Sequence, residues 1–413
     1  SKAVGTAAGI LLVLGLIPGL PHLAFLALGA GVAWMAYRLH QQEQTPEAVD
    51  QAPAAPKADE GSTKVTPLDL MEVQVGYGLI GLVEGTQGTA LLDRIKGLRR
   101  QFAESMGFVV PPIHIRDNLQ LRPNEYAVIL KGVQIAKADV LPGHLLAIDP
   151  GTGQRGLVQG IATKEPAFGL PALWVSEEAR EQAQMAGYTV VDASSAMTTH
   201  VSELIKRHGH ELVGRQEVQA LLDDVGKAHP KLVEELIPTL LPLGTVVRIL
   251  GNLLKEGIPI RDLRSILEAV SDHAATIKDP DVLTEFARQA LARTITKQYQ
   301  LPDGTLQVIT LDPQLDRSLA EQAAVLAPGA SLNLDPAMSH KLLSGLKQAA
   351  ERVAARGQQP IVLCSPAVRR HLRRLSDRLL HSVPVMGLNE VDALVRLQSL
   401  DTVRIDGELA QLS

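Results

Sequence analysis

The first forty residues restrict the architecture of this chain more than any other segment does. From Ala3 to Tyr37 there is no Asp, Glu, Lys or Arg. The run Ile17-Pro18-Gly19-Leu20-Pro21 interrupts this stretch, and a single straight helix could not contain it. Two apolar segments result. Leu20 to Tyr37 would give a helix of roughly 27 Å, close to a hydrocarbon core of about 30 Å, whereas Ala3 to Ile17 falls short at roughly 22 Å.

This pattern predicts a transmembrane helical hairpin over residues 1–38, with a truncated first span. Lys2 and Arg38 flank the two segments, so a hairpin places both charges on one side, which the positive-inside rule makes cytoplasmic. Everything after residue 38 is then cytoplasmic as well. A signal peptide fits less well, because Lys2 alone is a thin basic region and no small-residue cleavage pattern follows. A buried helical hairpin in a soluble core remains the other alternative.

Residues 39–64 have a different composition. They are rich in Gln, Ala, Pro and charged residues and show no apolar period, so they cannot bury enough surface to fold alone. We interpret them as a flexible linker that leads into a cytoplasmic part beginning near Val65.

The composition of the whole chain limits its function. Its 413 residues suffice for two to four domains, and apolar content that is only 3% aromatic favours helical and α/β layers. A formal charge of −5 argues against a dedicated nucleic-acid binder, which needs clustered Lys and Arg. A single Cys excludes a disulfide framework and any site with several thiolate ligands, and it suggests a reducing compartment.

Hydrophobic periodicity predicts the elements of the cytoplasmic part. We expect a strand at 70–75, an amphipathic helix at 91–104, strands at 126–131 and 133–135, a helix that begins at 176–179, and a strand at 188–191. Residues 199–294 read as almost continuously helical, with turns at 208–209, 229–230, 257–259 and 279–280. A hairpin over 299–308 and a strand at 361–364 follow.

These elements group into four lobes behind the hairpin and the linker. The predicted boundaries are 65–146 for subdomain 1, completed by about 193–212; 147–192 for an α/β insert as subdomain 2; 213–296 for a helical subdomain 3; 297–401 for an α/β subdomain 4; and 402–413 for a tail.

Two glycine-rich stretches match the dinucleotide-binding pattern G-x-G-x-x-G. The one at 76–81 follows a predicted strand, but it does not open a helix, and the acidic residue about 20 positions on, Glu104, lies inside the amphipathic helix. The one at 151–156 has no strand and helix around it. Chance matches in a glycine-rich chain explain both better than nucleotide binding does.

Cys364 and Arg370 match the C-x5-R pattern of cysteine phosphatases between a strand and a helix. Pro366 removes one of the backbone N–H groups that such a phosphate loop needs, and no glycine eases the turn. A buried Cys at a strand end is the better interpretation, with Ser365 as N-cap and Pro366 at N1. The helix that follows carries a basic stripe, which we interpret as a solvated face or, alternatively, as a surface for an acidic protein partner. Its members are Arg369, Arg370, Arg373, Arg374 and Arg378.

Three other features could carry chemistry. His208 and His210 have a spacing that suits a metal on a strand better than on a helix, and no third ligand is identifiable. Residues 257–263 resemble a helix-turn-helix elbow, for which packing is the better explanation in an acidic chain. No nucleophile elbow, Walker A or H-E-x-x-H motif occurs, so an enzyme would lack a recognisable site.

Long strings in the cytoplasmic part resemble a known family. Residues 115–121, continuing to Val140, are similar to the start of the cytoplasmic domain of the FlhA/SctV export-gate family of type III secretion. EPAFGLPALWV at 165–175, GYTVVDASSAMTTH at 187–200, and the segments SPAVRRHLRRL and VPVMGLNEV agree in order. The resemblance covers about residues 66 to 400, and the form of residues 165–168 is similar to the flagellar branch. The virulence branch stays an alternative.

The resemblance implies a multidomain α/β cytoplasmic region with four subdomains, among them a ferredoxin-like insert, behind membrane spans that this chain mostly lacks. It implies a ring of nine copies at the bacterial inner membrane that docks complexes of export chaperones with their cargo, beside other export-gate proteins and the export ATPase complex. It implies no catalysis, cofactor or metal. The family's docking dimple lies between the first two subdomains and maps onto Glu165, where well-studied members have Asp, and onto Phe168 and Thr199.

The residues themselves support that site independently. Phe168 is one of only five Phe, and it lies in a stretch too rich in turn residues to be a core strand. Exposed aromatic residues in loops are candidates for protein-binding hot spots. Phe168 as a plug between subdomains is the alternative. Two functions therefore compete: a docking ring without chemistry, and a nucleotide- or phosphate-using enzyme built on Gly76 or Cys364.

Overall fold

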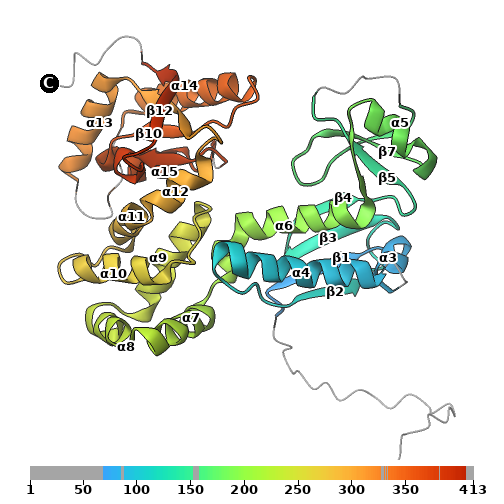
Figure 1. Cartoon of the computed structure of the whole chain (residues 1–413), viewed down its shortest axis with the longest axis horizontal. Coiled ribbons are helices and arrows are strands. Elements are labelled where there is room, and N and C mark those ends of the chain that lie inside the picture. Colours follow the sequence, from blue (N-terminus) through green and yellow to red (C-terminus); the bar gives the residue numbers. More distant parts are fainter. Residues whose placement is uncertain are drawn as a thin grey trace, which may run out of the picture. The chain divides into compact units, whose positions relative to one another are not determined.

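The computed structural model of the chain describes residues 68–84, 88–151, 158–326, 330, 332, 334–380 and 382–405 (Figure 1). The predicted hairpin at 1–38, the linker at 39–64 and residues 406–413 of the predicted tail lie outside the described residues, as do residues 152–156 of the second glycine motif.

The first sheet has the strand order β2-β1-β3-β4. Its strands are β1 (Met71–Val75), β2 (Ile113–Asp117), β3 (Glu125–Leu130) and β4 (Val133–Asp139). β1 runs parallel to β2 and antiparallel to β3, and β3 pairs antiparallel with β4 across Lys131 and Gly132, which both have positive φ. The predicted strands at 70–75, 126–131 and 133–135 are confirmed.

Three helical segments connect β1 to β2: η1 (Tyr77–Leu79), α3 (Ile80–Glu84) and α4 (Gly88–Met106). The predicted helix at 91–104 lies within α4, and the spacing of its apolar residues places them on one buried face, as expected. Leu91, Ile95, Leu98 and Phe102 are all buried in the same hydrophobic cluster as residues of β1 and β3.

The insert is a small sheet in the order β6-β7-β5-β8 with antiparallel pairing throughout. Its elements are β5 (Leu145–Ile148), β6 (Ile161–Lys164), β7 (Pro171–Val175), η2 (Glu177–Ala179), α5 (Arg180–Met185) and β8 (Thr189–Asp192). A ferredoxin-like unit has the order βαββαβ. The described residues of the insert have the order βββαβ. The connection from β5 to β6 passes through residues 152–157, which lie outside the described residues, so the ferredoxin-like insert stays a prediction. β6 and β7 form a hairpin, because Gly160 lies close to the backbone of Trp174 and Gly169, at φ +71°, permits a tight turn.

α6 (Ala193–Leu212) returns from the insert to the first sheet. Figure 1 shows it beside α4, which it contacts. The predicted turn at 208–209 is wrong, because α6 continues through both residues. Gly209 has a packing role instead: a Cβ there would lie 3.4 Å from Cζ of Phe108.

The predicted helical stretch at 199–294 is confirmed, apart from short breaks, and its last helix extends to Tyr299. The elements are α7 (Arg215–Ala228), α8 (Pro230–Glu234), η3 (Glu235–Leu240), α9 (Leu243–Lys255), α10 (Leu263–Ala274), α11 (Pro280–Ala290) and α12 (Ala292–Tyr299). The predicted breaks at 229–230, 257–259 and 279–280 are confirmed. Asp262 and Asp279 cap α10 and α11 with their carboxylates, and Pro280 occupies the first turn of α11, as N-terminal signals require.

The third sheet is parallel, in the order β11-β10-β9-β12. Its elements are β9 (Thr305–Leu311), α13 (Pro313–Ala324), α14 (Pro336–Ala354), β10 (Val362–Cys364), α15 (Pro366–Ser376), β11 (Val385–Gly387), η4 (Leu388–Glu390) and β12 (Arg396–Val403). The hairpin predicted at 299–308 is wrong, because Tyr299 ends α12 and β9 pairs with strands that come later in the chain. Its turn exists, with Gly304 at φ +85°.

Among the described residues, no single helix is long and apolar enough to cross a bilayer. By length and composition alone, the pair Pro230–Leu240 and Leu243–Lys255, bent by 109°, could do so.

One large buried cluster joins the first sheet, α4, α6 and the helices that follow, and a second fills the C-terminal α/β part.

Candidate functional site

A single carboxylate organises the loop between β6 and β7. Glu165 is only 3% exposed, and its two oxygens accept hydrogen bonds from the backbone N–H groups of Ala167, at 2.8 Å, and Phe168, at 2.6 Å. The N–H of Gly169 donates to the carbonyl of Glu165 at 2.9 Å, with Gly169 at φ +71°. A left-handed residue is needed there, which explains the glycine. The loop is therefore tightly closed around Glu165.

This closed loop directs Phe168 into solvent. The Phe168 side chain is 62% exposed, and Leu170 and Ile161 of the same hairpin are also exposed. The alternative in which Phe168 is a buried plug is wrong for this structure. Glu165 carries the charge of the predicted site but scarcely reaches the surface, so the exposed part of the hairpin is mainly apolar.

Thr199 lies on α6 and is exposed. Its neighbour His200 is 6% exposed, and Nδ1 of His200 lies 2.7 Å from the hydroxyl of Tyr126 in β3. The two rings meet edge to face, with centroids 5.8 Å apart. The structure thus joins Glu165 and Phe168 in one loop and places Thr199 on a separate element.

Protonation states determine the direction of the buried hydrogen bond. Burial raises the pKa of Tyr126, and the charge of Glu165 raises it further. Burial also lowers the pKa of His200 to about 4, with a smaller effect from Arg207. At neutral pH the Tyr126 hydroxyl therefore donates to a neutral imidazole. No periodic pattern identifies this pair, because both residues occupy positions where an apolar side chain would fit the pattern equally well.

The first glycine motif packs against protein. The N–H groups of Gly76 and Gly78 donate to the carbonyls of Glu125 and Pro123 at 2.8 and 2.9 Å. A Cβ on Gly76 would lie 2.0 Å from the carbonyl oxygen of Arg122, and one on Gly78 would lie 2.6 Å from Oδ1 of Asn124. These glycines allow the loop before β3 to approach closely. Both amides that could hold a pyrophosphate already have partners.

The polar groups of the loop after Cys364 also bind other groups of the protein. Cys364 is buried, and burial raises the pKa of its thiol, which lies 3.7 Å from the carbonyl oxygen of Met386. Ser365 is the N-cap of α15 and Pro366 is at N1, as predicted, but the Ser365 hydroxyl donates to Asp316 at 3.2 Å and accepts no hydrogen bond from an N–H group of the helix. The Ser365 N–H donates to the same carboxylate at 3.1 Å. A carboxylate thus occupies the place where a phosphate would bind.

The basic stripe of α15 is only partly solvated. Arg374 and Arg378 are exposed, but Arg369 and Arg373 are 2% and 9% exposed. Arg369 pairs with Glu285 of α11 and with Glu256, which follows α9, at 2.7 Å. The prediction of a solvated face is wrong for these two residues, because acidic residues far away in the sequence neutralise Arg369 in the interior.

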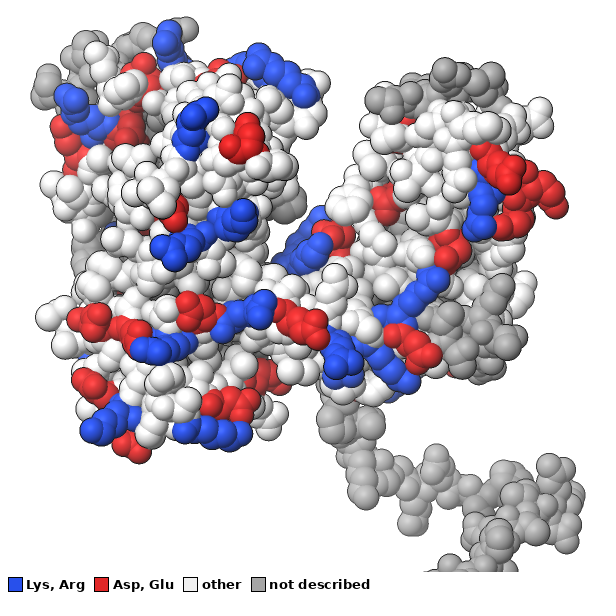
Figure 2. All heavy atoms as spheres, viewed as in Figure 1, with Lys and Arg blue, Asp and Glu red and all other residues white. Residues whose placement is uncertain are grey.

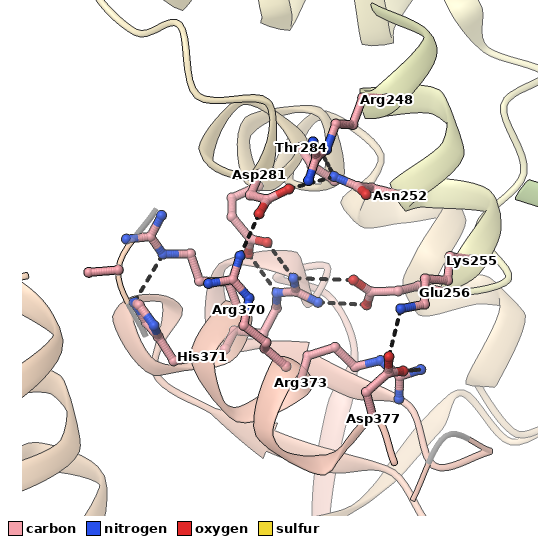
Figure 3. A pocket seen from close by; sticks show the side chains of 14 residues that line it. Arg248, Asn252, Lys255, Glu256, Asp281, Thr284, Arg370, His371, Arg373 and Asp377 are labelled. Carbon is pink, nitrogen blue, oxygen red and sulfur yellow. Dashed lines mark hydrogen bonds and ion pairs between the residues drawn. The ribbon is translucent and has the colours of Figure 1, made fainter. Parts of the chain in front are cut away.

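A cavity of about 240 Å³ opens over this network between α9, α11 and α15 (Figure 3). Most of its charged lining is already paired: Lys255 binds Asp377 at 2.6 Å, and Arg374 binds Asp281 at 2.7 Å. Arg370 donates to Nε2 of His371 at 3.1 Å. The cavity therefore lies at an ion-paired junction between the helical region and the C-terminal α/β part.

The remaining candidates are structural. His208 pairs with Glu211 at 2.9 Å, and the described residues contain no group of three or more His, Cys, Asp or Glu side chains that could hold a metal. The elbow at 257–263 packs against the end of α4, where the N–H of Ile260 donates to the carbonyl of Met106 at 2.8 Å. On the face shown in Figure 2, acidic and basic side chains are interspersed, which does not suit a nucleic acid.

Comparison with known proteins agrees with the resemblance in the sequence. The model of the FHIPEP family matches residues 1–396. Two curated relatives are the flagellar biosynthesis proteins FlhA of Bacillus subtilis, 41% identical over 349 residues, and of Escherichia coli, 41% identical over 383 residues. These alignments cover 84% and 92% of this chain but 51% and 54% of the relatives, so the chain spans about half of their length.

Solved structures share the fold. The Chlamydia pneumoniae CdsV protein is 26% identical, with a TM-score of 0.74 over 83% of this chain and 100% of that one. A nonameric EPEC SctV-C structure is 22% identical, with a TM-score of 0.66 over 82% and 100% of the two chains. The mixed α/β architecture described above is therefore shared with these proteins.

Proposed function

The chain belongs to the FHIPEP family, and on that premise we propose that it is the C-terminal part of a flagellar export-gate protein that docks complexes of export chaperones with their cargo. The flagellar branch is favoured because curated FlhA relatives reach 41% identity, whereas CdsV is 26% identical. The docking role itself is carried by one observation: Phe168 is 62% exposed on a loop that Glu165 holds closed.

An exposed aromatic side chain on a rigid loop suits protein recognition. Its apolar area is in water before binding, and little conformational entropy is lost when a partner covers it. Leu170, 41% exposed, extends the apolar surface. Thr199 contributes a hydroxyl from α6. Glu165 acts mainly by holding the loop, and its side chain, longer than Asp, reaches both amides.

We further propose that copies of the chain assemble into a ring, nine in number by analogy with the family, at the bacterial inner membrane, with residues 65–401 in the cytoplasm. Other export-gate proteins and the export ATPase complex would be its neighbours. No cofactor, metal or catalytic step enters this proposal. The enzyme alternative has little support, because the amides of Gly76 and Gly78 and the loop after Cys364 are occupied by protein groups.

Binding to the purified 413-residue chain tests the docking role. A flagellar export chaperone in complex with its cargo serves as the probe. Phe168→Ala should weaken its binding by roughly tenfold or more, the range of an aromatic hot spot, and should scarcely change the melting temperature. Leu394→Ala is the matched control, because Leu394 is 93% exposed in a different part of the fold. It should leave binding within about twofold.

Two results would contradict the proposal. If Phe168→Ala binds the probe as the parent does, Phe168 is not part of the docking site. If Leu394→Ala weakens binding as much as Phe168→Ala does, the probe adheres to any exposed apolar residue. A large drop in melting temperature for Phe168→Ala would show instead that the side chain belongs to the core. Calorimetric binding of a nucleotide that Gly78→Val abolishes would favour the enzyme.

A further inference from the structure

Two buried polar side chains, in β3 and α6, are hydrogen-bonded to each other, and a third buried polar side chain lies in the insert. Tyr126 in β3 is 0% exposed, His200 in α6 is 6% exposed, and Glu165 in the insert is 3% exposed. They come from three elements that are distant in the sequence. Burying polar groups is costly unless each finds a partner, so each of these side chains needs an explanation.

The hydrogen bond between Tyr126 and His200 connects the first sheet to α6. Its 2.7 Å length and the edge-to-face contact of the rings leave little freedom for either side chain. Thr199 precedes His200 and is exposed on the same helix. Any shift of α6 against β3 would break this bond and move Thr199 with it.

The Glu165 carboxylate uses both oxygens for the amides of its own loop. Its charge nevertheless acts on Tyr126, since it contributes to the raised pKa of that hydroxyl.

The body of the insert is anchored in the same region. Leu146, Ala172 and Trp174 lie on paired strands, β5 and β7, and are buried in the large cluster that includes β3 and α6. The sheet of the insert therefore packs into the first core by its apolar face. In the same core, the hydrogen bond between Tyr126 and His200 fixes α6 on β3 more narrowly than apolar contact alone would.

We infer that Tyr126 and His200 are positioning residues of the docking site: their hydrogen bond holds α6, with Thr199, in a fixed place relative to the Glu165 loop, with Phe168, before cargo arrives. This inference rests on the proposed function. It assigns a role to two residues that are too buried to touch cargo, and it implies that part of the docking affinity comes from preorganisation.

Tyr126→Phe tests the inference in the full chain, because it removes the hydroxyl and keeps the ring. Binding of the chaperone–cargo probe should weaken roughly fivefold, as expected for the loss of one neutral hydrogen bond. Amide hydrogen exchange in peptides covering residues 165–170 and 193–200 should accelerate. Tyr188→Phe is the matched control: Tyr188 is 7% exposed in the small core of the insert, outside this cluster. It should change neither quantity.

A rescue pair separates hydrogen bonding from packing. His200→Asn keeps an acceptor near the place of Nδ1, whereas His200→Leu keeps the bulk without an acceptor. We expect His200→Asn to bind the probe within about twofold of the parent and His200→Leu to resemble Tyr126→Phe. Melting temperatures of all variants show whether each is folded.

The outcomes distinguish this inference from the proposed function. If Phe168→Ala weakens binding but folded Tyr126→Phe changes neither binding nor loop exchange, the positioning role is wrong and the docking role stands. If His200→Asn and His200→Leu bind the probe alike, the hydrogen bond is not responsible for the change in binding. If Phe168→Ala itself leaves binding unchanged, the docking proposal fails, and loop exchange in Tyr126→Phe still reports whether the bond orders the loop.

Discussion

Arg288 of α11 and Glu390 of η4 are 102 positions apart in the sequence and form an ion pair in the interior, with Nη2 and Oε2 at 2.5 Å. Their side chains are 3% and 2% exposed. Glu256 accepts hydrogen bonds from both Arg288, at 2.9 Å, and Arg369, at 2.7 Å. This network connects the helical region to the third sheet.

Arg288→Met should destabilise the chain by about 3 to 5 kcal/mol, because it leaves Glu390 and Glu256 buried with fewer cationic partners. Urea denaturation measures the free energy of unfolding. Arg264→Met is the control, since Arg264 is exposed and pairs with Glu268 at 2.8 Å on the surface. That change should cost less than about 1 kcal/mol. Equal costs for the two variants would contradict the importance of the buried network.

The Glu256 carboxylate should make the free energy of unfolding depend on pH in the acid range. Burial alone would raise its pKa, but the charges of Arg369 and Arg288 outweigh burial and lower the pKa from 4.5 to about 2. The unfolded chain binds this proton more readily, so the stabilisation is complete above about pH 4.5 and is lost as the pH falls toward 2. It amounts to roughly 3 kcal/mol at about 1.4 kcal/mol per pH unit.

Denaturation of Glu256→Gln between pH 7 and pH 3 checks this expectation. The variant should be less stable than the parent at pH 7, and the difference should shrink as the pH falls. The exposed Glu268→Gln provides the comparison. A difference that stays constant over this range would show that Glu256 does not titrate as described.

Gly76→Ala and Gly81→Ala should have opposite effects on stability. A Cβ on Gly76 meets the carbonyl oxygen of Arg122 at 2.0 Å, so the backbone must shift, at about 1 to 3 kcal/mol. Gly81 lies in α3 with nothing within 4 Å of an added Cβ, so alanine should stabilise the helix by about 0.5 to 1 kcal/mol. Thermal unfolding of both variants tests the packing role of the motif. Equal effects would refute it.

Cys364 should resist thiol reagents while the chain is folded. It is 5% exposed, and its raised pKa keeps it protonated near neutral pH. Because it is the chain's single Cys, labelling with a maleimide reports unfolding directly. Labelling should be slow in buffer and fast in denaturing urea. Rapid labelling in buffer would indicate an open C-terminal α/β part, or a reactive thiol.

Local periodicity predicted the elements that pack through one face. The apolar spacing in α4 matches its buried residues, and Pro280 marks the start of α11. The alternation expected in β3 does not match, because that strand is buried almost throughout. The loop position of Phe168 followed from its turn-rich neighbours, and its exposure agrees with that. These features depend on neighbours within a few residues, which a sequence shows directly.

Features that depend on distant partners were not predictable in this way. Arg369 looked like a surface residue until Glu256 and Glu285 were seen to neutralise it. Gly209 looked like a helix break, but it accommodates Phe108. The turn residues before β9 predict a hairpin over 299–308, whereas the parallel partners of β9 lie later in the chain. Nor does any local pattern identify the Tyr126 and His200 pair.

The return of α6 from the insert has a consequence for synthesis on the ribosome. The first sheet is complete once β4 ends at Asp139, but the helix that lies beside α4 and binds Tyr126 ends only at Leu212. At about 5 to 20 residues per second, this delay lasts roughly 4 to 15 seconds. The apolar side of the nascent sheet is incompletely covered during that time, so a ribosome that stalls between these positions would release an aggregation-prone fragment.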